Sequence, residues 1–121
     1  MSTADRIASL LVRMRDAAAD AHRLTEGVDE ADFMGSIMLN RSVGMSLLMA
    51  SEVAAQIIKT NPDFVVDHPE FPWQAMRGMR NRIAHNYFDI NLQFVWDTAR
   101  NDVPDLVSML DVIIQMRIQG E

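Results

Sequence analysis

The chain of 121 residues is long enough for one domain and too short for two of ordinary size, so we expect a single domain over residues 1–121. Because it contains no cysteine, it has no disulfides, thiolate metal ligands or cysteine nucleophile, which fits a reducing cytoplasm. The net charge of −6 argues against a protein that coats nucleic acid with its whole surface, and charged residues interrupt the apolar runs, so we expect neither export nor a membrane span.

Two long helices are predicted in the first half of the chain. Apolar residues at three- and four-residue spacing predict a helix over about 4–24, which Gly27 ends. Asp29 or Asp32 is suited to cap a second helix over about 30–59. This second helix carries so few charges that we expect it to be buried on most sides.

The second half opens with a loop marked by three prolines, Pro62, Pro69 and Pro72. Pro72 is suited to open a third helix that begins at Trp73. Asp89 and Asn91 predict a turn and a cap before a fourth helix, and Pro104 predicts the start of a fifth. Since no segment alternates polar and apolar residues for long, the predicted fold is all-α, an up-and-down bundle of four or five helices.

Positive charge is concentrated in one segment. Residues 71–88 contain three arginines and no carboxylate, so this segment carries +3 while the rest of the chain carries −6 − 3 = −9. These arginines are Arg77, Arg80 and Arg82. The planar fork of arginine suits bidentate phosphate contacts better than the point charge of lysine. The pattern indicates one local positive site on an acidic body, and a chance unevenness of composition remains the alternative explanation.

A helical wheel places these residues relative to the predicted core. At about 100° per residue, Trp73, Met76, Ile83 and Tyr87 share one apolar side, and Arg80 falls within it. Burying a charge without a partner lowers the stability of the fold by several kcal/mol. We therefore expect Arg80 to contact a carboxylate, a ligand or a second subunit.

A polar strip borders that apolar side. It contains Arg77, Asn81 and His85, with Gly78 beside it, where the missing side chain permits close approach of a backbone or a phosphate. Arg80 and His85 lie about 140° apart on the wheel, so they converge only across a groove, through the length of arginine, or with a second copy of the helix.

A purely structural interpretation explains the same residues. In that interpretation Arg80 pairs with Glu52 inside the core, His85 caps a carbonyl and Tyr87 packs. Spacing alone favours it, because an arginine and a histidine five residues apart often occur by chance.

The stretch WQAMRGMRNRIAHNYFDINLQFVWDTARNDVPDL resembles the signature of the HepT-like ribonucleases, a branch of the HEPN (higher eukaryotes and prokaryotes nucleotide-binding) superfamily found as toxins in bacterial toxin–antitoxin pairs. The matching residues are Trp73, Met79, Arg80, Asn81, His85, Tyr87, Trp96, Pro104 and Leu106. One departure lies in the second helix, where such proteins often carry glycine-glutamate-alanine and this chain has Ser51, Glu52 and Val53. The departure concerns helix packing more than chemistry.

The resemblance implies a HEPN-like fold and a metal-independent endoribonuclease that works as a homodimer, with RNA as its substrate. It assigns catalysis to Arg80 and His85, and RNA binding to Arg77, Asn81 and Arg82. It also implies a cognate nucleotidyltransferase antitoxin that transfers AMP onto Tyr87.

We assign no metal site and no cofactor, because the remaining histidines, His22 and His68, lack the four-residue helical spacing of a zinc motif. Two other classes stay open at this stage. One is a catalytically silent subunit that binds nucleotide or substrate for a partner nucleotidyltransferase, and the other is a dimerisation module without a ligand.

Overall fold

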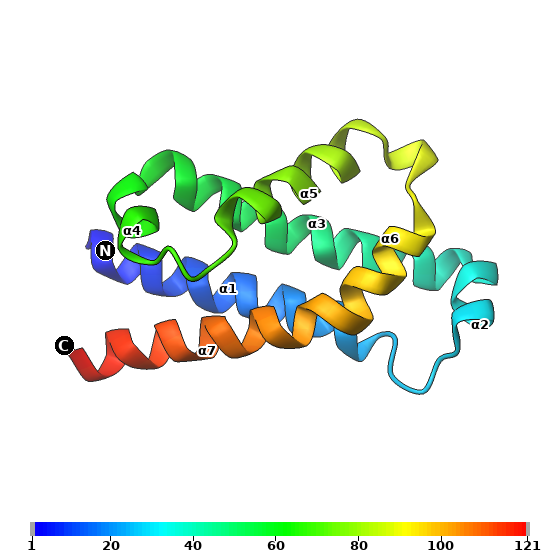
Figure 1. Ribbon diagram of the computed structural model, residues 1–121, viewed down its shortest axis with the longest axis horizontal. Coiled ribbons are helices and arrows are strands. Elements are labelled where there is room, and N and C mark those ends of the chain that lie inside the picture. Colours follow the sequence, from blue (N-terminus) through cyan, green and yellow to red (C-terminus); the bar gives the residue numbers. More distant parts are fainter. Residues whose placement is uncertain (1, 121) are drawn as a thin grey trace.

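The computed structural model describes residues 2–120, apart from the side chain of Tyr87. Three long helices run lengthwise through the molecule: α1 (Thr3–Arg23), α3 (Ile37–Thr60) and α7 (Val103–Gly120). The shorter helix α5 (Trp73–His85) lies against α3 at one edge of the bundle, and both ends of the chain lie at the same end of the molecule (Figure 1). The predicted all-α bundle is confirmed, and the described residues contain no strand.

The predicted second helix is wrong in one respect, because the structure divides it into α2 (Glu30–Gly35) and α3. Ser36 lies between them in an extended conformation, and its hydroxyl accepts a hydrogen bond from the Leu39 amide at 3.1 Å. Glycine has a low helix propensity and serine is a preferred N-cap, so the Gly35-Ser36 pair ends one helix and starts the next. Asp29 caps α2 as predicted, accepting from the Asp32 amide at 2.8 Å.

The proline-marked segment also differs from the prediction, since Pro62 opens a short helix, α4 (Pro62–Asp67). Proline suits the first turn of a helix, where its missing N–H is not needed. The loop is therefore confined to residues 68–72.

Where the sequence predicted a boundary between the fourth and fifth helices, the structure has a continuous helical segment that changes its helix type. Helix α6 (Leu92–Asp97) runs through a π-helical turn, Thr98–Asp102, directly into α7. Pro104 cannot donate to the carbonyl of Arg100 and crowds it. The wider turn relieves this conflict, with the Val103 amide donating to the carbonyl of Thr98.

The core is apolar and contiguous between the long helices. Its fully buried large side chains include Leu11 and Met14 on α1, Leu47 on α3 and Leu110 on α7. No helix among residues 2–120 is both long and apolar enough to cross a membrane.

Aromatic packing fixes the start of α5. The Trp73 indole N–H donates to the carbonyl of His68 at 2.9 Å, and the indole ring packs against Phe64 and Phe71. At its other end α5 stops at His85, and a 3₁₀ turn, Tyr87–Asp89, leads to Asn91, whose side chain caps α6. The charged residues of α5 are therefore presented from a helix that is anchored at its first turn.

Candidate active site

One face of α5 is buried and the other carries the polar motif. The buried residues are Trp73, Met76, Met79 and Ile83. Arg77, Asn81 and His85 are exposed beside the buried face. The wheel placed Arg80 within the apolar side, which is wrong in detail, because its side chain is 38% exposed and lies at the border. The polar strip next to the core is thus confirmed.

Arg80 contacts a carboxylate, which is one of the three partners predicted from its position on the wheel. Its Nε donates to Glu52 Oε1 on α3 at 2.7 Å, and its Nη1 donates to Asn81 Oδ1 at 3.1 Å. The Glu52 side chain is 48% exposed, so the ion pair lies at the surface and not in the core. A pair with this exposure contributes only about 0–1 kcal/mol to the free energy of unfolding.

The structural interpretation is therefore met only in part. Arg80 does pair with Glu52, but outside the core. The exposed ring of His85 makes no hydrogen bond with any residue that the structure describes, so it does not cap a carbonyl there. The predicted packing of the Tyr87 side chain lies outside the described part of the chain.

Arg80 and His85 occupy the last two turns of the same helix. Five residues separate them by about 7.5 Å along the axis and by about 140° around it. Among the described residues no hydrogen bond joins them directly. The single chain thus presents the two groups on different faces of one helix and does not converge them on one atom.

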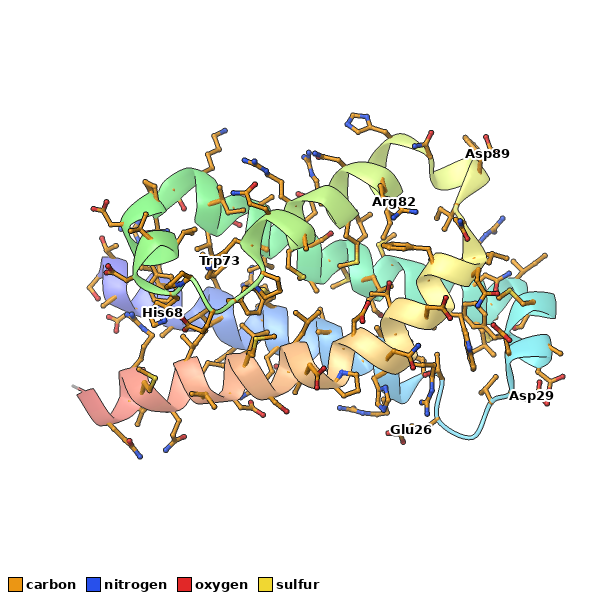
Figure 2. All side chains as sticks on the ribbon, in the orientation of Figure 1. Glu26, Asp29, His68, Trp73, Arg82 and Asp89 are labelled. Carbon is orange, nitrogen blue, oxygen red and sulfur yellow. The ribbon has the colours of Figure 1, made fainter. Side chains whose placement is uncertain are left out.

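The other two arginines of the motif, Arg77 and Arg82, contact different parts of the chain. Arg77 donates from Nη2 to the Gln74 side chain one turn earlier. Arg82 projects toward α6 and lies over the ring of Phe94, with its guanidinium carbon 3.8 Å from the ring centre (Figure 2). Arg82 is consequently on the far side of α5 from the Arg80–Glu52 pair, and a substrate contacting both must cross the helix.

Gly78 sits in open space on α5. A Cβ added there would meet no atom within 4 Å, and no positive φ requires glycine at this position. The isolated chain therefore gives no reason for glycine here, which leaves the close approach of another molecule as the predicted explanation.

An apolar groove of about 550 Å³ lies beside the motif, between α3 and the segment that follows α5. Its lining includes Met45 and Leu48 from α3, and Ile83, Phe88 and Ile90 from α5 and the turn after it. Exposed methionines continue this surface along α3: Met38, Met45 and Met49. Their spacing of seven and four residues puts them on one face, which leads to Glu52 three residues later.

The remaining histidines have structural partners. His22 Nδ1 lies 2.9 Å from the Ala99 carbonyl, and His68 Nδ1 lies 3.1 Å from Glu70 Oε1. The pKa of the Glu70 carboxyl is lowered by a backbone hydrogen bond and then by the hydrogen bond from His68. No group of three metal-binding side chains occurs among the described residues.

Glu52, Gln74 and Phe94 contact the arginines of the motif and were not predicted as site residues. Glu52 had a sequence signal, because it is the only charged residue of α3 between Arg41 and Lys59. Phe94 had none, since its contact with Arg82 depends on how the chain turns back after α5.

Comparison with known proteins agrees with the motif. The family model described as "Ribonuclease HepT-like" matches residues 14–113. "Putative RNase MJ0127" of Methanocaldococcus jannaschii is 34% identical over 77 residues, which is 63% of each chain. "Putative RNase TTE0752" of Caldanaerobacter subterraneus subsp. tengcongensis is 30% identical over 74% of this chain and 78% of its own. "Probable ribonuclease HepT" of Thermococcus cleftensis is 29% identical over 73% of this chain and 81% of its own.

No solved structure matches the chain. The family match covers all of α3, α5 and α6, the C-terminal part of α1 and most of α7, including every residue of the polar motif. The chain therefore belongs to the HepT-like ribonuclease family.

Proposed function

We propose that the protein is a metal-independent endoribonuclease that acts in the cytoplasm and cuts RNA with Arg80 and His85. The observation that carries this proposal is that α5 presents, in a member of a ribonuclease family, an oriented guanidinium and an exposed, unpaired imidazole five residues apart. The guanidinium keeps donors free for a phosphate, and the imidazole is free to exchange protons.

RNA supplies its own nucleophile for this reaction. The 2′-oxygen attacks the neighbouring phosphorus and its proton passes to a base, while the bond to the 5′-oxygen breaks and that oxygen takes up a proton. His85 serves the proton transfer, and Arg80 stabilises the negative charge that develops on the phosphoryl oxygens. The products are a 2′,3′-cyclic phosphate and a 5′-hydroxyl.

The neighbouring polar residues would hold the RNA. Arg77 and Arg82 are exposed cations that precede and follow Arg80 along α5, suited to backbone phosphates of an RNA that crosses the helix. Asn81 is exposed and already accepts from Arg80, so its amide N–H groups are available to orient a substrate oxygen.

A homodimer would complete the site. The 140° offset between Arg80 and His85 argues that one copy does not surround a phosphate, whereas two-fold symmetry brings two polar strips to one cleft. The apolar groove and the exposed methionines Met38, Met45 and Met49 support this arrangement, because they adjoin the motif.

Regulation by a nucleotidyltransferase antitoxin would make the protein the toxin of a toxin–antitoxin pair. In this step the Tyr87 oxygen attacks the α-phosphorus of ATP, pyrophosphate leaves and the phenol proton is lost to solvent. Tyr87 begins the 3₁₀ turn two residues after His85, so a phosphodiester there would place negative charge near the arginines that RNA needs. Co-expression with the antitoxin should add AMP to wild type and not to Tyr87→Phe in intact mass spectra.

The direct test of the activity is cleavage of RNA by purified protein in EDTA. Wild type should cut, and His85→Ala should be slower by roughly 10²–10⁴-fold. Because His85 is exposed and unpaired, the melting temperature of the variant should not change. Wild type that binds RNA or nucleotide but never cuts would contradict the proposal and favour a non-catalytic subunit of a nucleotidyltransferase complex.

A further inference from the structure

Glu52 is an isolated carboxylate in an apolar stretch of α3. Its neighbours Ser51 and Val53 are buried, and the Ser51 hydroxyl donates to the Leu48 carbonyl at 2.8 Å, so the helix is firmly packed here. Exposed surface pairs stabilise folded proteins little, so folding alone gives a weak reason for a charge at this position. Its contact is with Arg80, 28 residues further along the chain.

Arg80 donates hydrogen bonds to the protein from two of its three side-chain nitrogens. A guanidinium has five N–H groups. One on Nε goes to Glu52 and one on Nη1 goes to Asn81, which leaves 5 − 2 = 3, the second on Nη1 and both on Nη2. The protein thus holds the plane of the fork from one side and leaves two of its nitrogens with donors for an incoming oxygen anion.

From this geometry we infer that Glu52 is the positioning residue for Arg80. It fixes the guanidinium through Nε so that Nη2 and the remaining Nη1 hydrogen face the phosphate at which RNA is cut. This assignment rests on the ribonuclease function proposed above. Glu52 itself touches no reacting atom, and its effect passes through Arg80 alone.

The negative charge of Glu52 predicts opposite effects on RNA affinity and on the rate of cleavage. A carboxylate beside the phosphate repels RNA, so a positioning carboxylate lowers affinity while it raises the rate of the chemical step. Glu52→Ala should therefore lower kcat roughly 10²-fold, the effect of a misplaced catalytic group, while uncleavable RNA with 2′-O-methyl riboses binds as tightly as before or more tightly. Glu52→Gln should recover much of kcat, because its amide oxygen still accepts from Nε.

Glu26→Gln is the matched control, since it removes the same charge from an exposed loop on the opposite side of the bundle from α5 (Figure 2). It should leave both kcat and RNA affinity unchanged. Full kcat in Glu52→Ala would overturn the inference. So would a joint loss of kcat, RNA affinity and melting temperature in Glu52→Ala and Glu52→Gln alike, because that pattern indicates a structural role.

A second measurement does not depend on RNA cleavage. In ¹⁵N NMR spectra the Arg80 Nε–H signal, assigned by its absence from Arg80→Lys, should be slow to exchange in wild type and lost to solvent exchange in Glu52→Ala. Equal exchange in both proteins would overturn the positioning role even if the protein cuts RNA. Protection that depends on Glu52 in a protein that cuts no RNA would support the positioning of Arg80 and contradict only the ribonuclease.

Discussion

Arg80 is the residue whose position, ion pair and proposed catalytic role depend most closely on one another. Its apolar neighbours on α5 force it to the border of the core, and its Nε contact with Glu52 at 2.7 Å restricts the rotation of a long side chain. The position on the wheel predicted that Arg80 would contact a carboxylate, a ligand or a second subunit, and the structure shows the carboxylate. The sequence named Glu52 only within the structural interpretation, because which acid of a distant helix faces Arg80 depends on tertiary packing.

Replacement of Arg80 by alanine or lysine should separate charge from geometry. Both variants should lose roughly 10²–10³-fold in kcat, because lysine keeps the charge but cannot donate to Glu52 and to a phosphate from one rigid plane. Initial rates on a defined RNA measure the effect. Arg13→Ala, which removes an exposed arginine from α1, is the control and should cut at the wild-type rate.

Equal activity of Arg80→Lys and wild type would show that only charge matters at this position. Such a result would contradict the role of the planar fork. It would leave the assignment of His85 untouched.

At the level of elements, α5 combines a rigid start with an abrupt end. The Trp73 indole anchors its first turn, and the helix stops at His85, so the histidine ring extends from a helix end. Caps made the start of α2 and of α6 predictable from Asp29 and Asn91. The break at Ser36 was not predictable from periodicity, because the apolar pattern continues across it. The π-helical turn escaped prediction because Pro104 is equally compatible with the start of a new helix.

Gly78 offers a test of close approach to α5. Because an added Cβ meets no atom of the chain, Gly78→Ala should stabilise the helix by about 1 kcal/mol and raise the melting temperature. If RNA or a second subunit lies against this backbone, the same variant should cut RNA more slowly. Thermal melts and cleavage rates on one preparation measure both effects.

A more stable Gly78→Ala that cuts RNA at the wild-type rate would show that nothing approaches Gly78. The glycine would then have no functional explanation. Lower stability would contradict the open surroundings of the residue.

At the scale of the whole molecule, the positively charged segment and the exposed apolar surface lie next to each other. The +3 segment lies on a body that carries −9, so the proposed RNA substrate should approach where α5 is exposed. The groove of about 550 Å³ and the α3 methionines adjoin this segment. No sequence pattern predicted the groove, because it forms only where α3 meets the turn after α5.

Substitution on this surface should test the dimer. Met45→Glu places a charge in the groove and should give a monomer in sedimentation at micromolar concentration, with cleavage lost together with dimerisation. Met116→Glu on α7 is the matched control, since both methionines are 55% exposed, and it should stay dimeric and active. A wild-type monomer that cuts RNA would contradict the shared cleft.

The most direct test of the central claim uses the oxygen that the reaction needs. An RNA cut by the protein at a mapped site is compared with the same RNA carrying a single 2′-deoxyribose just before the cut, with EDTA present. We predict that the unmodified RNA gives a 2′,3′-cyclic phosphate and a 5′-hydroxyl and that the substituted RNA is not cut at that site. Cleavage of the substituted RNA at the same rate, or a 5′-phosphate on the product, would contradict catalysis by Arg80 and His85 through the 2′-hydroxyl.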